Sequence, residues 1–389
     1  LEVPSGALAD HIGRKRLVII SAILMIGEIS ILIFTPVGSP IVFWMFVINR
    51  ILSGAAEAAA SGADEALAYD SIPINNREAV WKKTIKRVMI MMSVGFVISS
   101  IIGALVYSPD FINSLLSTLN FETEFSKKHT VKFPLYLNFG TALIVFFIAC
   151  KFEEDHKISM GGNMTAIKES FAGTLRAGQW ILKSPAASCL ILIGLFYDSI
   201  IRVFYTILSN IYRILLIPEW CWGLVGAIAS IIGIGVAIIC EKMATTLSPS
   251  INFGVVTILT FLGCVAVSLA VPGWGVILLL PMFSAMRFLQ YFLSHYLNKV
   301  TPSEQRATVL SFKGLSMNLA FGLLTQIFGV LTARIYLSNK FKDAPDPQLS
   351  AFQYGLEWWP YYFSVGVIIL FGFIRLKYRK SITMLINQS

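Results

Sequence analysis

Apolar residues in this chain form near-continuous runs of roughly 20 residues. A run of that length crosses the hydrocarbon core of a bilayer as a helix, whereas membrane-spanning strands need alternating segments of about ten residues. The pattern therefore predicts an all-α polytopic membrane protein. The ten complete spans that we predict are Leu17–Thr35, Ile41 to about Ala66, Val88–Tyr107, Phe133–Cys150, Ala186–Leu216, Cys221–Cys240, Ile251–Val271, Trp274–Tyr296, Ala307–Ala333 and Tyr361–Ile374.

Three polar stretches between these runs are long enough to matter. Asp110–Lys132 is predicted to be a polar loop, and so is the Lys-, Asp- and Pro-rich stretch before Tyr361. Met164–Leu182 has apolar residues at helical spacing among charged ones, which predicts an amphipathic helix on the membrane surface. We therefore expect an N-terminal helix bundle (1–150), a cytoplasmic linker with that helix (151–185) and a C-terminal helix bundle (186–389).

The composition agrees with a membrane protein. The chain is 56% hydrophobic and 14% charged, whereas soluble domains carry about 25% charged residues. A net charge of +9 is compatible with nucleic-acid binding, but the cations lie in the loops between apolar runs. Of the 31 Lys and Arg residues, 21 lie on the side of the loops around Arg14 and Lys82, seven on the opposite side and three within spans. The side richer in Lys and Arg, which includes the C-terminus, is predicted to be cytoplasmic. The protein is predicted to lie in a plasma or inner membrane and to have no nucleic-acid partner.

The sequence contains no pattern for a chemical step. The five cysteines lack metal-ligand spacing, and no phosphate-cradling loop or nucleophile elbow is present. A polytopic membrane enzyme, such as a lipid-modifying transferase, would need an acid/base or metal cluster, and only scattered carboxylates are found. We therefore predict a protein that is not an enzyme and has no cofactor or metal.

A short basic segment lies between two apolar runs near the N-terminus. It matches G-x-L-a-D-x-x-G-r-k at Gly6, Leu8, Ala9, Asp10, Gly13, Arg14 and Lys15. Glycines allow a tight reversal between two helices, and an aspartate beside cations can form charge-assisted contacts at the membrane surface. The segment resembles the signature that joins the second and third helices of the major facilitator superfamily. The resemblance implies two six-helix bundles, with the first helix and most of the second missing from this chain.

Two further segments carry the same resemblance. Residues 50–57 are similar to the family's fourth-helix motif l-x-x-R-x-x-q-G-x-g, with Ser53 in place of glutamine, and residues 302–311 look like the R-A-T-x-L-S entry to its eleventh helix. The implied mechanism is alternating access in a monomer. The implied latch between bundles consists of Gly6, Asp10, Gly13, Arg14, Lys15 and Arg306. Gly95–Gly103 lacks the proline of the G-P-x-x-G-G motif common in drug/proton antiporters, so efflux and uptake both remain open.

Ionisable groups within spans are costly and usually face a partner or a wet cavity. Arg50, which the resemblance associates with proton coupling, and Glu57 lie two turns apart on one helix face, and Glu28 is alone in its span. Asp198 and Arg202 have i,i+4 spacing. Each pair could line a transport pathway or form a structural ion pair. Arg287 and Asn318 are further cavity candidates.

These observations predict a secondary active transporter of a small solute. No nucleotide-binding motif is present, so a proton gradient is the expected energy source, with Glu57 or Glu28 exchanging protons under the control of Arg50. A facilitative uniporter and a metabolite symporter are the alternatives. The expected partners are the solute, the proton and the lipid bilayer.

Overall fold

The structure, a computed structural model, describes residues 13–60, 64, 67–68, 71–73, 77–153, 172, 176, 178–301 and 306–387. A long helix occupies each of the ten predicted spans. These helices are α2 (Arg14–Phe34), α3 (Val42–Ala60), α5 (Arg77–Tyr107), α8 (Phe133–Cys150), α10 (Pro185–Thr206), α12 (Trp222–Thr246), α13 (Pro249–Leu269), α14 (Leu280–Val300), α15 (Arg306–Leu337) and α17 (Trp359–Asn387). Within the described ranges, nine helices are long and apolar enough to cross a membrane, or ten if a pair bent by 80° counts as one span. The all-α polytopic fold is confirmed.

The bent pair marks one place where the sequence prediction was wrong. Asp110–Lys132 was expected to be a loop, but it contains α6 (Pro109–Thr118) and the short α7 (Lys127–Thr130). The Ser108 hydroxyl accepts a hydrogen bond from the Phe111 amide at 3.4 Å, and proline occupies the first turn of α6. A serine cap followed by proline is a helix start signal. A new helix, α6, therefore begins at Pro109 and runs in a different direction from α5.

The polar stretch before α17 also contains a helix, α16 (Pro347–Glu357). Asp346 caps it through a hydrogen bond from the Leu349 amide to its Oδ1 atom at 2.9 Å. The predicted span Ala186–Leu216 is likewise two elements, because α10 ends at Thr206 and α11 (Leu208–Ile214) follows. In each case the apolar pattern located the membrane run correctly and left the adjoining short helix unrecognised.

The chain divides into two compact units. The N-terminal unit comprises residues 1–174 and 219–224, and the C-terminal unit comprises residues 175–218 and 225–389. Most of the predicted linker, including most of the proposed amphipathic helix, lies outside the described residues.

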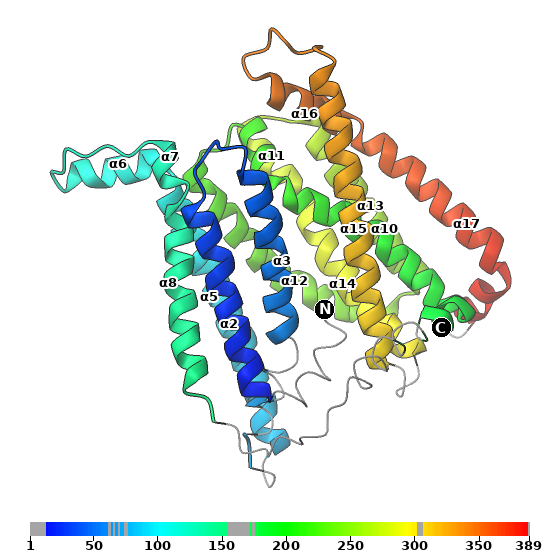
Figure 1. The fold of residues 1–389 in the computed structure, drawn as a ribbon. Coiled ribbons are helices and arrows are strands. Elements are labelled where there is room, and N and C mark those ends of the chain that lie inside the picture. The colour runs from blue at the N-terminus through cyan, green and yellow to red at the C-terminus, as the bar shows by residue number, and fades with distance from the viewer. Residues whose placement is uncertain are drawn as a thin grey trace. The chain divides into compact units, whose positions relative to one another are not determined.

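In the N-terminal unit, α2 packs between α3 and α8, and α5 packs on α8 and on the short helix η2 (Glu219–Cys221) (Figure 1). The Ser21 hydroxyl on α2 donates to the Ala56 carbonyl oxygen on α3 at 2.7 Å. Lys132 donates to the carbonyl oxygens of Ile33 and Thr35, at 2.7 and 3.0 Å. Its ammonium group thus satisfies acceptors at the C-terminal end of α2.

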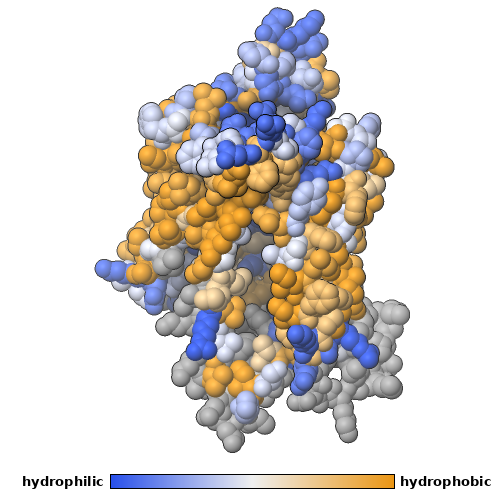
Figure 2. All heavy atoms as spheres, turned by 90° about the vertical axis from the view of Figure 1, so that its left-hand side faces the viewer, coloured by the Kyte–Doolittle hydropathy of each residue, from blue (hydrophilic) through white to orange (hydrophobic). Residues whose placement is uncertain are grey.

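The surface of this unit is largely apolar. Figure 2 shows apolar side chains covering much of the visible face. Large apolar side chains exposed on α3, α5 and α8 include Phe43, Trp44, Met91, Met92 and Phe147. Such a surface is stable in lipid, where the helices satisfy their own backbone hydrogen bonds.

The C-terminal unit is built around α10, whose side chains are mostly buried against α14, α15 and α17, while α13 packs on α14 and α17. Gly194 allows this close packing. A Cβ atom at Gly194 would lie 2.5 Å from Met317 Cε on α15 and 2.7 Å from Leu293 Cδ2 on α14. The three helices that carry the candidate site therefore meet at a small residue.

Candidate functional site

Helix α14 has one apolar and one polar face. Phe288, Leu289, Phe292 and Leu293 are buried in the C-terminal unit. Arg287, Gln290 and Ser294 are exposed, at i, i+3 and i+7 spacing. Because polar and charged side chains within a span avoid lipid, this stripe indicates the face of the unit that meets water.

Helix α10 contributes an ion pair. Arg202 donates to Asp198 from Nε at 2.7 Å, and its Nη2 also contacts the same carboxylate oxygen. The i,i+4 spacing therefore forms the contact that it predicts. The Asp198 side chain is 10% exposed and the Arg202 side chain 26% exposed, so the carboxylate is buried behind the guanidinium.

Arg202 also joins α10 to α15. Its Nη1 donates to Asn318 Oδ1 at 2.7 Å, and the guanidinium carbon lies 4.8 Å from the centre of the Phe321 ring. Asn318 itself is exposed. Two of the predicted cavity residues are thus in direct contact, although 116 positions separate them in the sequence.

Arg287 of α14 also lies near α10. It interacts electrostatically with Tyr205, one turn beyond Arg202. On its other flank, a Cβ atom at Gly233 of α12 would lie 3.2 Å from Arg287 Nε, so glycine lets the guanidinium lie against that helix. Arg287 therefore belongs to the same group of helices as the Asp198–Arg202 pair.

Sequence reasoning did not select Lys313 of α15. This side chain interacts electrostatically with Asp198. Lys313 was counted among the cations of the cytoplasmic side, although it lies in the second turn of the predicted span Ala307–Ala333, where the rule that selected Asp198 also applies. We call this group of residues the polar face (Asp198, Arg202, Tyr205, Arg287, Gln290, Lys313, Asn318). With three cations and one carboxylate, the polar face carries more positive than negative charge.

The carboxylates of the N-terminal unit are arranged differently. Glu28 Oε2 is buried and accepts no hydrogen bond from the described residues. Buried Asn49, which the sequence did not single out, donates from Nδ2 to the Glu28 carbonyl oxygen at 2.9 Å. Arg50 donates from Nε and Nη2 to Asn49 Oδ1, at 3.0 and 2.8 Å. No Arg50–Glu57 ion pair is present among the described residues, and both side chains are exposed.

The predicted latch falls only partly within the described chain. Gly6 and Asp10 lie outside it, as does the side chain of Arg306. Gly13 occupies the N-cap position of α2 with φ at 96°, a conformation that glycine adopts without strain. Arg14 and Lys15 form the first turn of α2. The backbone conformation at this motif position therefore favours glycine.

The chemistry available in these groups is recognition by charge and hydrogen bonds. In the part of the chain that the structure describes, no three His, Cys, Asp or Glu side chains gather into a metal-binding group. The five cysteines are free. The polar face can bind and orient a solute.

Comparisons with known proteins agree with the architecture. The family model described as Major Facilitator Superfamily matches residues 1–325. A bacterial homologue of the human lysosomal transporter Spinster, inward-facing and unoccupied, is similar at a TM-score of 0.68 and 15% identity, over 97% of this chain and 85% of that one. The same kind of homologue, inward-facing and occupied, gives 0.66 and 14%, over 98% and 86%. No curated protein matches the chain.

Proposed function

The chain belongs to the major facilitator superfamily, whose members are membrane transporters and not enzymes, and from this premise we propose that it is a secondary active transporter of a small solute, driven by a proton gradient. The solute moves by alternating access, and no covalent step is involved. Uptake and efflux differ only in the direction in which the same cycle runs.

The polar face carries this proposal. Seven polar or charged side chains on α10, α14 and α15 would be costly against lipid, and a water-filled solute pathway removes that cost. Arg202 is held in place by Asp198 and Asn318, so it can present a fixed charge without rearrangement. The excess of positive over negative charge favours a solute with an anionic or electron-rich group.

Proton coupling is assigned to the N-terminal unit. A buried carboxyl oxygen without a hydrogen-bond donor is costly as an anion, and proton binding lowers that cost. Glu28 Oε2 meets this condition, and its backbone is tied through Asn49 to Arg50. A movement of the Arg50 side chain would therefore be transmitted through Asn49 to the helical turn that carries Glu28. Glu57 is the second candidate carboxylate.

The latch and the topology complete the proposal. We assign Gly6, Asp10, Gly13, Arg14, Lys15 and Arg306 to the conformational latch between the bundles. The cation-rich loops and the C-terminus are cytoplasmic, in a plasma or inner membrane. The transporter works as a monomer, with the two bundles at 1–150 and 186–389 joined by the linker 151–185.

The test is a solute screen on the full-length protein in vesicles that enclose a pH-sensitive dye. A transported solute should move protons only when added to vesicles that contain the protein, and an opposing pH gradient should slow its flux. Glu28→Gln should abolish the gradient dependence while leaving solute counterflow. Flux that ignores the gradient in the wild type would indicate a uniporter or a sodium-coupled symporter. Coupling that survives in both Glu28→Gln and Glu57→Gln would move the proton site to another carboxylate.

A further inference from the structure

A large cavity lies within the C-terminal unit, apart from the polar face. Its volume is about 990 Å³, and α10, α13, α15, α16 and α17 line it. Helix α15 packs on α10 and α16, and α17 packs on α10 and α13, but no comparable packing joins α15 to α17 among the described residues. The cavity therefore occupies the gap between two spanning helices.

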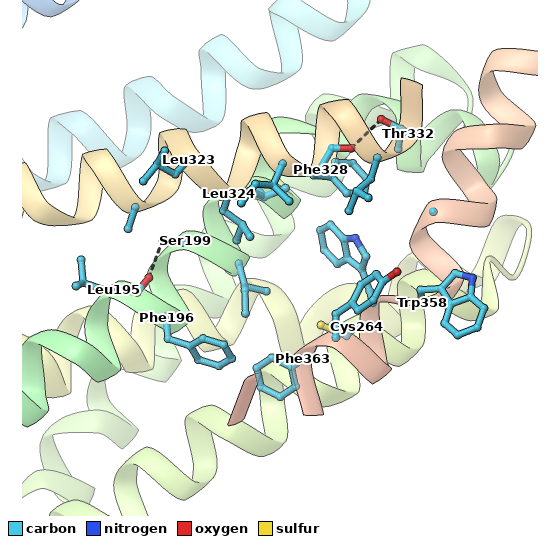
Figure 3. A pocket seen from close by; sticks show the side chains of 18 of the residues that line it. Leu195, Phe196, Ser199, Cys264, Leu323, Leu324, Phe328, Thr332, Trp358 and Phe363 are labelled. Atoms are coloured by element: carbon cyan, nitrogen blue, oxygen red, sulfur yellow. Dashed lines mark hydrogen bonds between the residues drawn. The ribbon is translucent and has the colours of Figure 1, made fainter. Parts of the chain in front are cut away.

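The walls of this cavity are apolar. Figure 3 shows Leu324 and Phe328 of α15 facing Phe196 of α10 and Phe363 of α17. Buried Cys264 of α13 lies at its inner wall. Wall residues such as Leu323 and Tyr362 are also exposed, so the cavity opens to the surface of the unit, and its apolar walls do not hold water well.

The serine and threonine hydroxyl groups in the walls are already hydrogen-bonded within their own helices. Ser199 donates to the Leu195 carbonyl oxygen at 2.6 Å, and Thr332 donates to the carbonyl oxygens of Phe328 and Gly329, each at 2.9 Å. Away from the aromatic residues of the lining, a polar solute that entered this cavity would lose its water and find no hydrogen-bond partner. The occupant must therefore be apolar along most of its length.

One end of the cavity is different. Tyr354, Trp358 and Tyr362 line it there, and such aromatic side chains concentrate where hydrocarbon meets the headgroup region. The ammonium group of Lys340 lies 3.5 Å from the centre of the Tyr354 ring. This end thus offers a cation to a phosphate beside an apolar channel.

We propose that the cavity is a binding site for one acyl chain of a membrane phospholipid, with the lipid phosphate at Lys340. The bilayer that surrounds α15 and α17 supplies such chains at high concentration. The site shares no residue with the polar face, and it does not depend on the proposed solute or coupling. An acyl chain bound against α15 would stabilise the position of this helix. Asn318, which accepts a hydrogen bond from Arg202, lies on the same helix.

A photoreactive lipid tests the site. The full chain is reconstituted with a phosphatidylglycerol whose acyl chain carries a diazirine, irradiated and mapped by mass spectrometry. Lipid around the protein labels exposed residues only, whereas a chain in the cavity should label Phe196 and Ser199 on the buried helix α10. Wild-type protein without label on α10 would overturn the proposal. A cross-link between α17 residues of two copies, together with absence of lipid label on α10, would overturn the proposal and indicate that a second copy covers the cavity.

Two variants on α15 form a matched pair. Leu323 lines the cavity and Leu319 does not, and their exposed fractions, 67% and 61%, let both accept a larger side chain. Leu323→Trp should reduce α10 labelling several-fold, and Leu319→Trp should leave it unchanged. Equal labelling in both variants would contradict occupancy of the cavity. Lys340→Gln should weaken labelling by the same lipid. An unchanged labelling yield would show that the lipid phosphate does not bind at Lys340.

Discussion

Exchange of Asp198 and Arg202 separates a binding role of the polar face from a purely structural one. The exchange keeps one positive and one negative group at i,i+4 spacing and moves the guanidinium by about one helical turn. A carboxylate at position 202 can accept a hydrogen bond from the Asn318 side-chain amide, in place of the bond that Asn318 Oδ1 accepts from Arg202 in the wild type. The pair should therefore survive, but the charge that faces the pathway is reversed.

The single variants set the scale. Loss of one partner of a buried ion pair costs about 3–5 kcal/mol, because the other charge remains buried. The Asp198 side chain is 10% exposed and that of Arg202 is 26% exposed. Water reaches the guanidinium more easily than the carboxylate, so Arg202→Gln should cost about 3 kcal/mol, and Asp198→Asn should cost less. The exchanged variant should recover only part of this stability, because an arginine at position 198 would meet the positive charge of Lys313.

Thermal unfolding in detergent and solute counterflow in vesicles measure the two effects separately. We expect unfolding temperatures in the order wild type, exchanged variant, Asp198→Asn and Arg202→Gln, from highest to lowest. Transport should be lost in both single variants and in the exchanged variant. Recovery of both stability and transport by the exchange would reduce the pair to a structural salt bridge and remove Arg202 from the binding site.

Three further predictions follow from the topology, the latch and the packing. Single cysteines in place of Lys82 and Lys168 should resist an impermeant thiol reagent applied outside cells, and labelling of either would contradict the cytoplasmic assignment. Asp10→Asn should cut transport strongly with the protein still in the membrane, since an amide lacks the charge of the latch; a normal rate would leave the motif as a topology signal only. Gly194→Val should lower the free energy of unfolding by about 1–3 kcal/mol through overpacking. Gly254→Ala should not, because its added Cβ would meet nothing within 4 Å. Equal effects of the two variants would contradict the packing of α10.

The sequence was most informative where one physical requirement acts along the whole chain. Each spanning helix must be apolar over its full length, so ten apolar runs located ten helices. The short helices α6 and α16 were missed because their polar residues suggested loops. Their start signals, Ser108–Pro109 and Asp346–Pro347, were present in the sequence but carried less weight than composition.

The site depends on contacts that no local pattern contains. Asp198 and Arg202 share one helix, so their pairing was predictable, but the Arg202–Asn318 hydrogen bond joins residues 116 positions apart. Asn49 shows the same limit, since an asparagine within a span does not reveal that it bridges Glu28 and Arg50. The cavity was unpredictable as well, because its lining residues from five helices resemble ordinary lipid-facing side chains.

Water access to the polar face tests the central claim most directly. In a background with the five native cysteines replaced, single cysteines are placed at Gln290 and Asn318, and at Ile258 and Ile369 as exposed apolar controls on α13 and α17. A charged methanethiosulfonate reagent reacts with thiolates in water and is excluded from hydrocarbon. A water-filled pathway along α14 and α15 predicts rapid labelling at Gln290 and Asn318 and very slow labelling at both controls. Slow labelling at all four positions would contradict the assignment of this face to a solute pathway.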